Sequence, residues 1–214
     1  MLIDTNSPFY AAVAIGSTKV TGMVGRVDSE GAVNVLSYVA VSSADFIRKG
    51  RVYNVDKMTQ CLKNIRKRLE DQINCDIKQV YVALNCQGMR SITHIEERTF
   101  PQRITVQQEL IESLKADNRD KISHDQILID TLPQEYTMGA FSTIEPVGVM
   151  TDRIRAQFLN IVCNASAIET IESCFRKAGL PIVRHTMAAD RLANVMTDEK
   201  ERSTGCAFVE MGSE

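Results

Sequence analysis

The chain has 214 residues, of which 44% are hydrophobic and 24% are charged, and its formal net charge is −2. A chain of this size can bury a core without disulfide bonds. Its near-neutral charge gives no electrostatic argument for binding nucleic acid or an anionic membrane. No apolar stretch approaches the ~18 residues of a membrane span, and residues 1–6 lack the pattern of a secretory signal. We therefore expect a cytoplasmic globular protein.

Three short apolar runs follow one another at the N-terminus, over residues 9–14, 20–27 and 33–41. Tight polar breaks separate them, which predicts a meander of three strands. The first break is a turn of candidate phosphate-binding residues, namely Gly16, Ser17, Thr18 and Lys19. Glycine lets the backbone approach a ligand closely, and successive N–H groups and hydroxyls form a concavity that suits an anion. A plain turn between two strands is the alternative for this segment taken alone.

An amphipathic helix is predicted after this meander. Asn54 is a suitable N-cap, and apolar residues then recur every three or four positions, which gives one buried stripe. The stripe consists of Val55, Met58, Leu62, Ile65, Leu69 and Ile73. A strand is predicted next, at residues 79–85. Because a strand that follows a crossover helix is typical of a βαβ unit, we expect parallel pairing in the sheet.

The middle of the chain, residues 86–163, has the elements of a small α+β module. Residues 91–98 alternate as a half-exposed strand does, and residues 105–108 have the pattern of a capping box that would open a helix. Further strands are predicted at residues 126–132 and 153–163. Two turns that begin with proline are also predicted, at Pro133–Tyr136 and at Pro146–Val149.

The last part of the chain, residues 164–214, returns to alternating helix and strand. Asn164 can cap a helix that ends in a left-handed turn at Gly179. A short strand, a helix, a charged loop and a final strand are then predicted, at residues 181–183, 188–196, 197–204 and 205–210. The sequence stops just after this strand, in a turn that lacks its second strand. We therefore expect the chain to be part of a longer protein.

A second candidate phosphate turn closes the sequence, formed by Glu210, Gly212 and Ser213. An acid at the end of a strand can hold a metal ion or orient water for attack on a γ-phosphate, so Glu210 is the candidate catalytic residue. Two strand–turn elements at opposite ends of one chain are the pattern of the actin and sugar-kinase superfamily. Such a pair favours the actin-like fold, which is of the α/β class.

The cysteines and histidines show no pattern of a metal site or of a catalytic pair. Six scattered cysteines without a CxxC pair are expected to be buried thiols. They are Cys61, Cys75, Cys86, Cys163, Cys174 and Cys206. The three histidines, His94, His124 and His185, are far apart in the sequence and lie beside no evident catalytic partner. We therefore predict neither a general base nor a metal centre among them.

Over essentially its whole length the chain resembles the FtsA family of actin-like bacterial cell-division proteins. The resemblance rests on residues 15–20, 49–52, 80–84, 133–136, 146–148, 153–163 and 178–180. The Pro-Gln-Glu-Tyr and Pro-Val-Gly turns are specific, because they lie in an insert that actin lacks at this position.

This resemblance implies a ribonuclease-H-like subdomain 1A, formed by residues 1–85 and 164–214, with a small α+β (SHS2) subdomain 1C inserted at residues 86–163. It implies a scaffold that links the FtsZ ring to the membrane. Self-association and later divisome proteins would use residues 86–163. FtsZ would be bound through a second lobe, and the membrane through a C-terminal amphipathic helix, both outside this chain. The expected location is the cytoplasmic face of the inner membrane at the division septum.

Two departures weaken the ATP site that the resemblance implies, half of which this chain would supply. Ala14 stands where the family has an acid before the first turn, which weakens the case for Mg²⁺ handling and hydrolysis. Ser213 and Glu214 replace glycines of the second turn, and the charge of Glu214 would repel phosphate. We expect at most weak ATPase activity, with ATP and Mg²⁺ bound only by a longer protein. The alternatives are an active actin-like ATPase and a type IV pilus assembly protein of the PilM kind.

Overall fold

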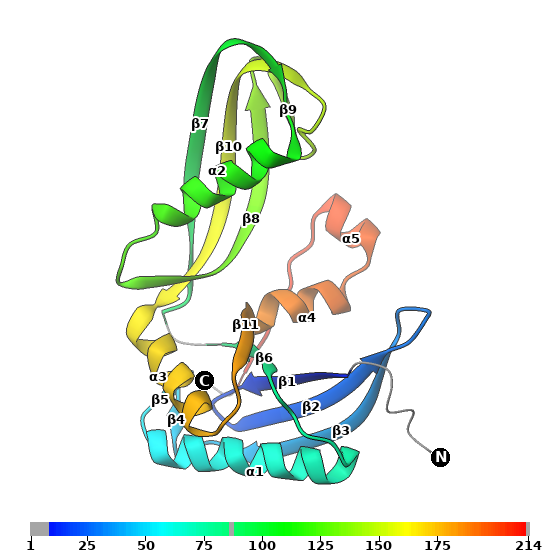
Figure 1. The fold of residues 1–214 in the computed structure, drawn as a ribbon, viewed down its shortest axis with the longest axis vertical. Helices are drawn as coiled ribbons and strands as arrows, with labels where there is room; N and C mark the ends of the chain where they lie inside the picture. Colours follow the sequence, from blue (N-terminus) through cyan, green and yellow to red (C-terminus); the bar gives the residue numbers. More distant parts are fainter. Residues whose placement is uncertain (1–8, 86–87, 213–214) are drawn as a thin grey trace. The chain divides into compact units, whose positions relative to one another are not determined.

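The structure, a computed structural model, describes residues 9–85 and 88–212 of the chain (Figure 1). The chain divides into two compact units. Unit 1 comprises Met1–Gln87 and Ala167–Glu214, and unit 2 comprises Gly88–Ser166, so that unit 2 is inserted into the sequence of unit 1. In the part of the chain that the structure describes, no helix is long and apolar enough to cross a membrane.

Unit 1 is built on a five-stranded mixed sheet with the strand order β11-β6-β1-β2-β3. The N-terminal meander is confirmed, because β1 (Tyr10–Ile15), β2 (Lys19–Val27) and β3 (Val33–Ser42) pair antiparallel in sequence order. The βαβ prediction is confirmed as well, since β6 (Val80–Leu84) pairs parallel with β1. The edge strand β11 (Ile182–Met187) in turn pairs parallel with β6. The carboxyl ends of three parallel strands therefore meet at one edge of the sheet.

The helix α1 (Val55–Ile73) covers one face of this sheet (Figure 1). The Asn54 side chain caps it by accepting a hydrogen bond of 2.9 Å from the Lys57 backbone N–H, as the sequence predicts. All residues of the predicted stripe except Val55 are buried, which also confirms the helical periodicity. Gly22 of β2 lets this helix approach closely, because a Cβ on Gly22 would clash with α1 side chains.

The helix α3 (Ala165–Lys177) leads back from unit 2 into unit 1. The Asn164 side chain accepts a hydrogen bond of 3.0 Å from the Ser166 N–H, so the predicted cap forms. At the other end Gly179 adopts a left-handed conformation with φ of 69°. The Leu180 N–H donates to the Phe175 carbonyl oxygen over 3.0 Å, which closes the helix as predicted.

A small hairpin precedes α1 and lies against the first turn of the sheet. It consists of β4 (Ile47–Arg48) and β5 (Arg51–Val52), which pair antiparallel. Its two central residues, Lys49 and Gly50, both have positive φ values, of 47° and 66°. Two successive left-handed residues are the geometry of a type I′ turn, which matches the twist of the flanking strands.

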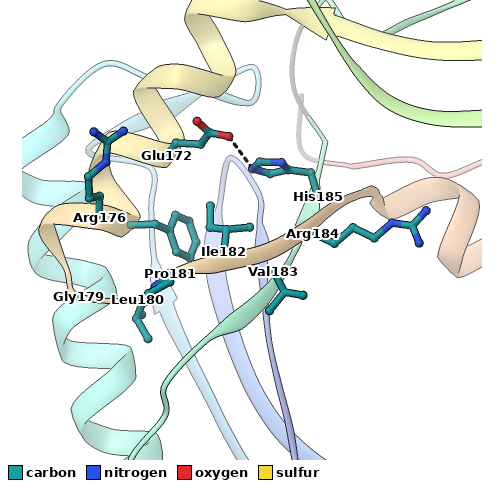
Figure 2. A pocket seen from close by; sticks show the side chains of 10 residues that line it. Glu172, Arg176, Gly179, Leu180, Pro181, Ile182, Val183, Arg184 and His185 are labelled. Atoms are coloured by element: carbon teal, nitrogen blue, oxygen red, sulfur yellow. Dashed lines mark ion pairs between the residues drawn. The ribbon is translucent and has the colours of Figure 1, made fainter. Parts of the chain in front are cut away.

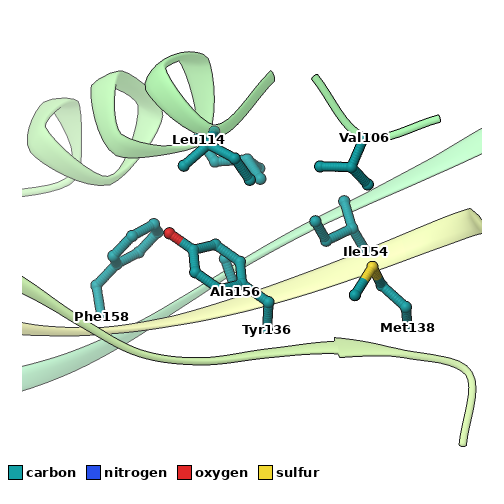
Figure 3. Packing of buried hydrophobic residues seen from close by; sticks show 8 residues of the cluster. Val106, Leu114, Tyr136, Met138, Ile154, Ala156 and Phe158 are labelled. Atoms are coloured by element: carbon teal, nitrogen blue, oxygen red, sulfur yellow. The ribbon is translucent and has the colours of Figure 1, made fainter. Parts of the chain in front are cut away.

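Unit 2 is a four-stranded antiparallel sheet with the order β7-β10-β8-β9. Its helix α2 (Gln108–Asp120) packs on one face of the sheet (Figure 1). The four strands of unit 2 are β7 (Arg90–Thr105), β8 (Gln126–Met138), β9 (Phe141–Thr143) and β10 (Met150–Asn164). Figure 3 shows the core, in which Leu114 of α2 lies over Tyr136 and Phe158. The two rings pack edge to face, and their centroids are 6.3 Å apart.

A buried polar cluster completes the contact between α2 and this sheet. The side-chain amides of Asn118 and Asn160, both 0% exposed, exchange two hydrogen bonds of 2.8 and 2.7 Å. The Thr131 hydroxyl donates to the Asn160 Oδ1 over 3.0 Å. Buried amides that satisfy each other fix one orientation of the helix, since a rotated or shifted helix would leave them unpaired.

Two predictions for unit 2 are wrong because strand pairing overrides the local signals. The predicted capping box does not form, since Thr105 remains in β7 opposite Met150 and α2 begins only at Gln108. The Gln107 side chain makes no capping hydrogen bond. The strand β8 also continues through the predicted turn at Pro133, where the pairing with β10 shifts register as in a β-bulge. The turn at Pro146–Val149 is confirmed, with a hydrogen bond of 3.2 Å from the Val149 N–H to the Pro146 carbonyl oxygen.

The C-terminal segment of unit 1 also differs from the prediction. The helix α4 (Ala188–Met196) has the predicted bounds. The predicted charged loop instead contains a short helix, α5 (Glu199–Thr204), which begins with a capping box between Asp198 and Glu201. Residues 205–210 form no strand, because they pair with no neighbouring strand among the described residues.

The prediction of uniformly buried cysteines is correct in part. Cys61, Cys163 and Cys174 are buried, whereas Cys75 and Cys206 are exposed free thiols. Cys75 follows the C-terminus of α1, and Cys206 lies in the unpaired segment after α5, so neither belongs to a packed element. Cys86 lies outside the described residues.

Candidate functional site

A pocket of about 320 Å³ in unit 1 contains both predicted phosphate turns. Its lining is formed by Ala14, Ile15, Gly16, Ser17, Thr18, Lys19, Thr21, Asn85, Ala188, Glu210 and Gly212. Every predicted cofactor-binding residue in the described part of the chain is therefore among the lining residues. Ser213, the remaining predicted residue, and Glu214 lie outside the described residues.

The additional lining residues come from the carboxyl ends of the parallel strands. Ile15 ends β1, Asn85 follows β6, and Ala188 follows β11. Ligands of open α/β sheets bind in the crevice outside the carboxyl ends of the strands. The position of the pocket thus agrees with that rule, independently of the sequence of its turns.

The first turn is closed by its own hydrogen bonds. The Gly16 N–H donates to the Lys19 carbonyl oxygen over 3.0 Å, and a Cβ on Gly16 would lie 3.0 Å from that same oxygen. Three further hydrogen bonds attach the turn to neighbouring segments, and in one of them the Ser43 N–H donates to the Thr18 carbonyl oxygen over 3.0 Å. The buried Ser43 hydroxyl donates to the Gly16 carbonyl oxygen over 2.7 Å, and the Ser17 Oγ accepts a hydrogen bond of 3.0 Å from the Gly50 N–H. These hydrogen bonds are all made to the protein itself, so they constrain the conformation of the turn.

The donors that remain in this turn suit an anion. The backbone N–H groups of Ser17 and Thr18 have no partner among the described residues. Thr18 and Lys19 are exposed at the mouth of the pocket, so a hydroxyl and an ammonium group can reach the same ligand. Two successive N–H groups beside a cation form a concavity of the kind that binds phosphate. Because Gly16 uses its own N–H inside the turn, its role is close packing of the backbone rather than donation to a ligand.

The second turn contributes differently from the first. Glu210 and Gly212 line the pocket, but their segment is irregular and its neighbours Val209 and Met211 are 74% and 90% exposed. A Cβ placed on Gly212 would meet no atom within 4 Å. This wall of the pocket is therefore carried by a segment with little packing of its own.

The lining fits a phosphate better than it fits Mg²⁺. Magnesium prefers oxygen ligands and is usually held through one or two carboxylates together with the phosphates. Glu210 is the one carboxylate among the lining residues of the described chain, and the Ala14 side chain offers no ligand atom. No group of three His, Cys, Asp or Glu residues that could hold a metal occurs among the described residues. Glu210 could hold the ion, with Thr21 and Asn85 as neutral oxygen donors, but no second acid is present to fix its position.

A second pocket, of about 540 Å³, lies between α3 and β11 and was not predicted from the sequence (Figure 2). His185 lies at this pocket with its Nε2 3.6 Å from Glu172 Oε1, so the histidine has a carboxylate partner that sequence reasoning missed. Burial lowers the pKa of His185, and the Glu172 carboxylate opposes this shift. The two residues are 13 positions apart in the sequence, and a helix end and a turn lie between them, so only the tertiary fold brings their side chains together.

Comparison with known proteins was made at the level of sequence and of fold. A scan against models of known protein families finds no match. The chain is 25% identical to the cell division protein FtsA of Buchnera aphidicola subsp. Schizaphis graminum over 219 residues, which cover 99% of this chain and 51% of that protein. It is 26% identical to FtsA of Porphyromonas gingivalis, with 95% of this chain and 43% of that protein covered. It is 25% identical to FtsA of Escherichia coli K12, with 99% of this chain and 50% of that protein covered.

Among solved structures, the PilM-PilN type IV pilus biogenesis complex matches with a TM-score of 0.51 and 15% identity. The match covers 86% of this chain and 51% of the matched chain. At this identity the likeness concerns the fold alone. The expected α/β fold with a separate α+β module is confirmed, and the chain spans about half the length of the curated relatives it matches. The chain is therefore homologous to FtsA over nearly its whole length and has an actin-like ATPase fold.

Proposed function

We propose that this chain serves bacterial cell division as FtsA does, as a protein scaffold rather than as an efficient ATPase. The observation that carries the proposal is the homology to FtsA, which extends over 99% of the chain. In this role the protein to which the chain belongs would link the FtsZ ring to the cytoplasmic face of the membrane at the septum and recruit later divisome proteins. FtsZ and the membrane would be bound by parts of such a protein that correspond to the other half of its relatives' length.

The pocket at the first turn would hold the phosphates of ATP, with weak or absent hydrolysis. When bound, Mg²⁺ would neutralise part of the triphosphate charge. The N–H groups of Ser17 and Thr18 and the ammonium of Lys19 would bind and orient the phosphates. Glu210 is the candidate for orienting water, and Ala14 supplies no acid beside it.

Titration calorimetry with Mg·ATP tests this part of the proposal directly. We expect the chain alone to bind ATP more weakly than a dissociation constant of about 1 mM, because Glu210 is the one carboxylate among the described lining residues and a second lobe would hold the rest of the ligand. Micromolar affinity, or turnover that Glu210→Gln abolishes, would favour the alternative of an active actin-like ATPase.

Unit 2 would carry the surface for self-association and for division partners. Four large apolar residues are exposed around its β9 hairpin, which is unusual for a solvated loop. They are Phe141, Ile144, Val147 and Met150, and they are between 53% and 74% exposed. The hairpin also ends the sheet, because β9 pairs on one side only. An apolar tip beside a free strand edge favours a protein partner over a small molecule.

Substitutions in this tip test the scaffold role. Ile144→Glu and Val147→Glu should reduce self-association in sedimentation velocity and recruitment of division proteins in living cells. Val33→Glu is the matched control, because Val33 is 66% exposed but lies on the β3 hairpin of unit 1. If both tip variants associate and localise to the septum as the control does, the assignment of partner contacts to unit 2 is wrong.

A pilus assembly role of the PilM kind remains the second candidate. The single observation on its side is the fold likeness to a PilM-PilN complex, at 15% identity. Localisation of a fluorescent fusion at pilus assembly sites, in place of the division septum, would favour it.

A further inference from the structure

The β4–β5 hairpin is joined by hydrogen bonds to the first of the two phosphate turns. At its tip, the Gly50 N–H donates to the Ser17 Oγ over 3.0 Å. At its base, the Ile47 N–H donates over 2.8 Å to the carbonyl oxygen of Ser43, the same residue whose hydroxyl holds the turn. Ile47 and Ser43 are 1% and 0% exposed, so this connection belongs to the core. The hairpin is therefore attached to the turn through both its base and its tip.

The sequence of this hairpin is unfavourable for its own stability. Lys49 occupies the first central position of a type I′ turn with φ of 47°, where asparagine, aspartate or glycine is usual. Other L-residues are strained in this left-handed region. In addition, Arg48 lies directly opposite Arg51, and like charges opposite each other destabilise a strand pair. Residues that break local rules in this way gather at functional sites. A cationic tip with these features suits an anionic ligand.

Lys49 lies within reach of the phosphate pocket. It is exposed and lies outside the pocket lining, but it directly precedes Gly50, whose nitrogen is 3.0 Å from the Oγ of the lining residue Ser17. The four-carbon stem of a lysine places its ammonium group about 6 Å from the Cα atom, which is enough to span this gap. Arg48 is directed elsewhere, since its guanidinium lies over the Tyr53 ring, 5.4 Å from the centroid.

The position of Lys49 complements that of Lys19. Lys19 follows Ser17 and Thr18 in the chain, whereas Lys49 lies beside Ser17 across the hairpin contact. Two ammonium groups would thus flank the backbone N–H groups of Ser17 and Thr18. Lys49 already makes an interaction in the protein, but an ammonium group has three N–H donors and can bind a ligand oxygen as well.

We propose that Lys49 is a second phosphate-binding cation of this site and that it makes the site prefer a chain of phosphates to a single phosphate. One phosphate group can satisfy two N–H groups and one ammonium group. A second ammonium group finds a further anionic partner only when the ligand carries more phosphates. The inference rests on the proposed phosphate site and deepens it, because it adds a residue from outside the two turns and names the class of ligand that this residue selects.

Titrations with inorganic phosphate and with tripolyphosphate test this inference, followed by the NMR amide signals of Ser17 and Thr18 at constant ionic strength. Tripolyphosphate should bind the unchanged chain more tightly than phosphate does. Lys49→Asn should weaken the binding of tripolyphosphate about fivefold, as expected for one exposed ion pair, and that of phosphate less than about twofold. Lys49→Arg should retain the preference for tripolyphosphate, because it keeps the charge.

Two properties of the variants separate a binding role from a structural one. Asparagine is favoured in the left-handed conformation, so Lys49→Asn should unfold at the same or a higher temperature than the unchanged chain although it binds less tightly. Lys63→Asn is the matched control, because it removes the same charge from an exposed position of α1 outside the pocket lining. Its affinity for tripolyphosphate should stay within about 1.5-fold of that of the unchanged chain.

The outcomes distinguish this inference from the proposed function. If neither ligand shifts the amide signals of Ser17 and Thr18 in the unchanged chain, the phosphate site itself is wrong and Lys49 has no role in it. If the unchanged chain binds both ligands equally, if Lys49→Asn keeps the preference, or if Lys63→Asn loses it to the same extent, only the role of Lys49 is overturned. A loss in Lys49→Arg as large as that in Lys49→Asn would show that the charge is not responsible, and would overturn it as well.

Discussion

Substitution of Gly22 by alanine should destabilise unit 1 through overpacking between β2 and α1. A Cβ at this position would lie 2.9 Å from Leu69 Cδ1 and even closer to Ile65 Cγ2. Both atoms belong to side chains that are at most 2% exposed and are packed against the sheet. The helix must therefore move outward, or both side chains must leave their preferred rotamers.

Two terms of opposite sign determine the magnitude. Overpacking a well-filled core costs about 1–3 kcal/mol. Replacing a strand glycine by alanine stabilises the strand by about 0.5–1 kcal/mol, because alanine loses less conformational freedom on folding. The net expectation is a loss of about 1–2 kcal/mol in the free energy of unfolding of unit 1. Gly212→Ala is the matched control, because its Cβ would meet no atom within 4 Å and should change this free energy little.

Hydrogen exchange measured by mass spectrometry suits this test, because it reports on the amides of α1 separately from unit 2. Global unfolding of a chain with two units need not be two-state. The double variant Gly22→Ala/Ile65→Ala should be more stable than the sum of the two single changes implies, by about 0.5–3 kcal/mol, since the added methyl group fills the space that Ile65 leaves. An unchanged or greater stability of Gly22→Ala, or strict additivity in the double variant, would refute the assignment of a close contact at this glycine.

Three further predictions concern buried polar groups and thiols. Asn160→Ala should lower the free energy of unfolding of unit 2 by about 1–3 kcal/mol in urea, because it leaves the buried amide of Asn118 unsatisfied. A smaller loss of free energy than an Asn→Ala change gives at the surface would contradict this. Burial lowers the pKa of His185 below its usual 6.5, so the unfolded chain binds more protons than the folded chain below about that pH. The contribution of His185 to the free energy of unfolding should thus be fully present above pH 6.5 and should be lost as the pH falls. The stability of the unchanged chain should therefore decline with falling pH more steeply than that of His185→Phe, and parallel pH profiles of the two would refute this prediction. Maleimide should label the exposed Cys75 and Cys206 before the buried Cys61, because burial raises the pKa of the Cys61 thiol to about 11. Equal labelling rates for these three cysteines would contradict this and show that unit 1 opens readily.

Local sequence signals were sufficient where the tertiary environment agrees with them. The helix α1 has a cap at Asn54 and an apolar stripe, and both appear in the structure because the stripe meets an apolar sheet. The signals failed where pairing with another strand decided the outcome. Thr105 stays extended because it pairs with Met150, and Pro133 is accommodated by a bulge opposite β10. Neither partner can be identified from the residues adjacent to it in the sequence.

In the candidate site, too, only the residues that are adjacent in the sequence were predicted reliably. The first turn was predicted because its glycine, hydroxyls and cation are consecutive. Asn85 and Ala188 were not predicted, because only the parallel order of β1, β6 and β11 brings the residues after these strands together. Glu210 was predicted on a strand but lies in an irregular segment, so the residue lines the pocket without the predicted secondary structure. The groove beside His185 had no sequence signal, since it depends on the position of α3 against an edge strand.

The insertion of unit 2 has a thermodynamic consequence for unit 1. Strands β6 and β11 must pair across the whole inserted sequence, yet the folded insertion places Arg90 directly opposite Val162 in its own sheet. Folded unit 2 thus acts as a short tether between the two strands. If it unfolded, the loop that connects the two strands would lengthen about fourfold, which is two doublings and would add about 1.2 kcal/mol to the entropic cost of the β6–β11 pairing. Mutations that unfold unit 2 should therefore loosen the far edge of the unit 1 sheet through chain connectivity alone.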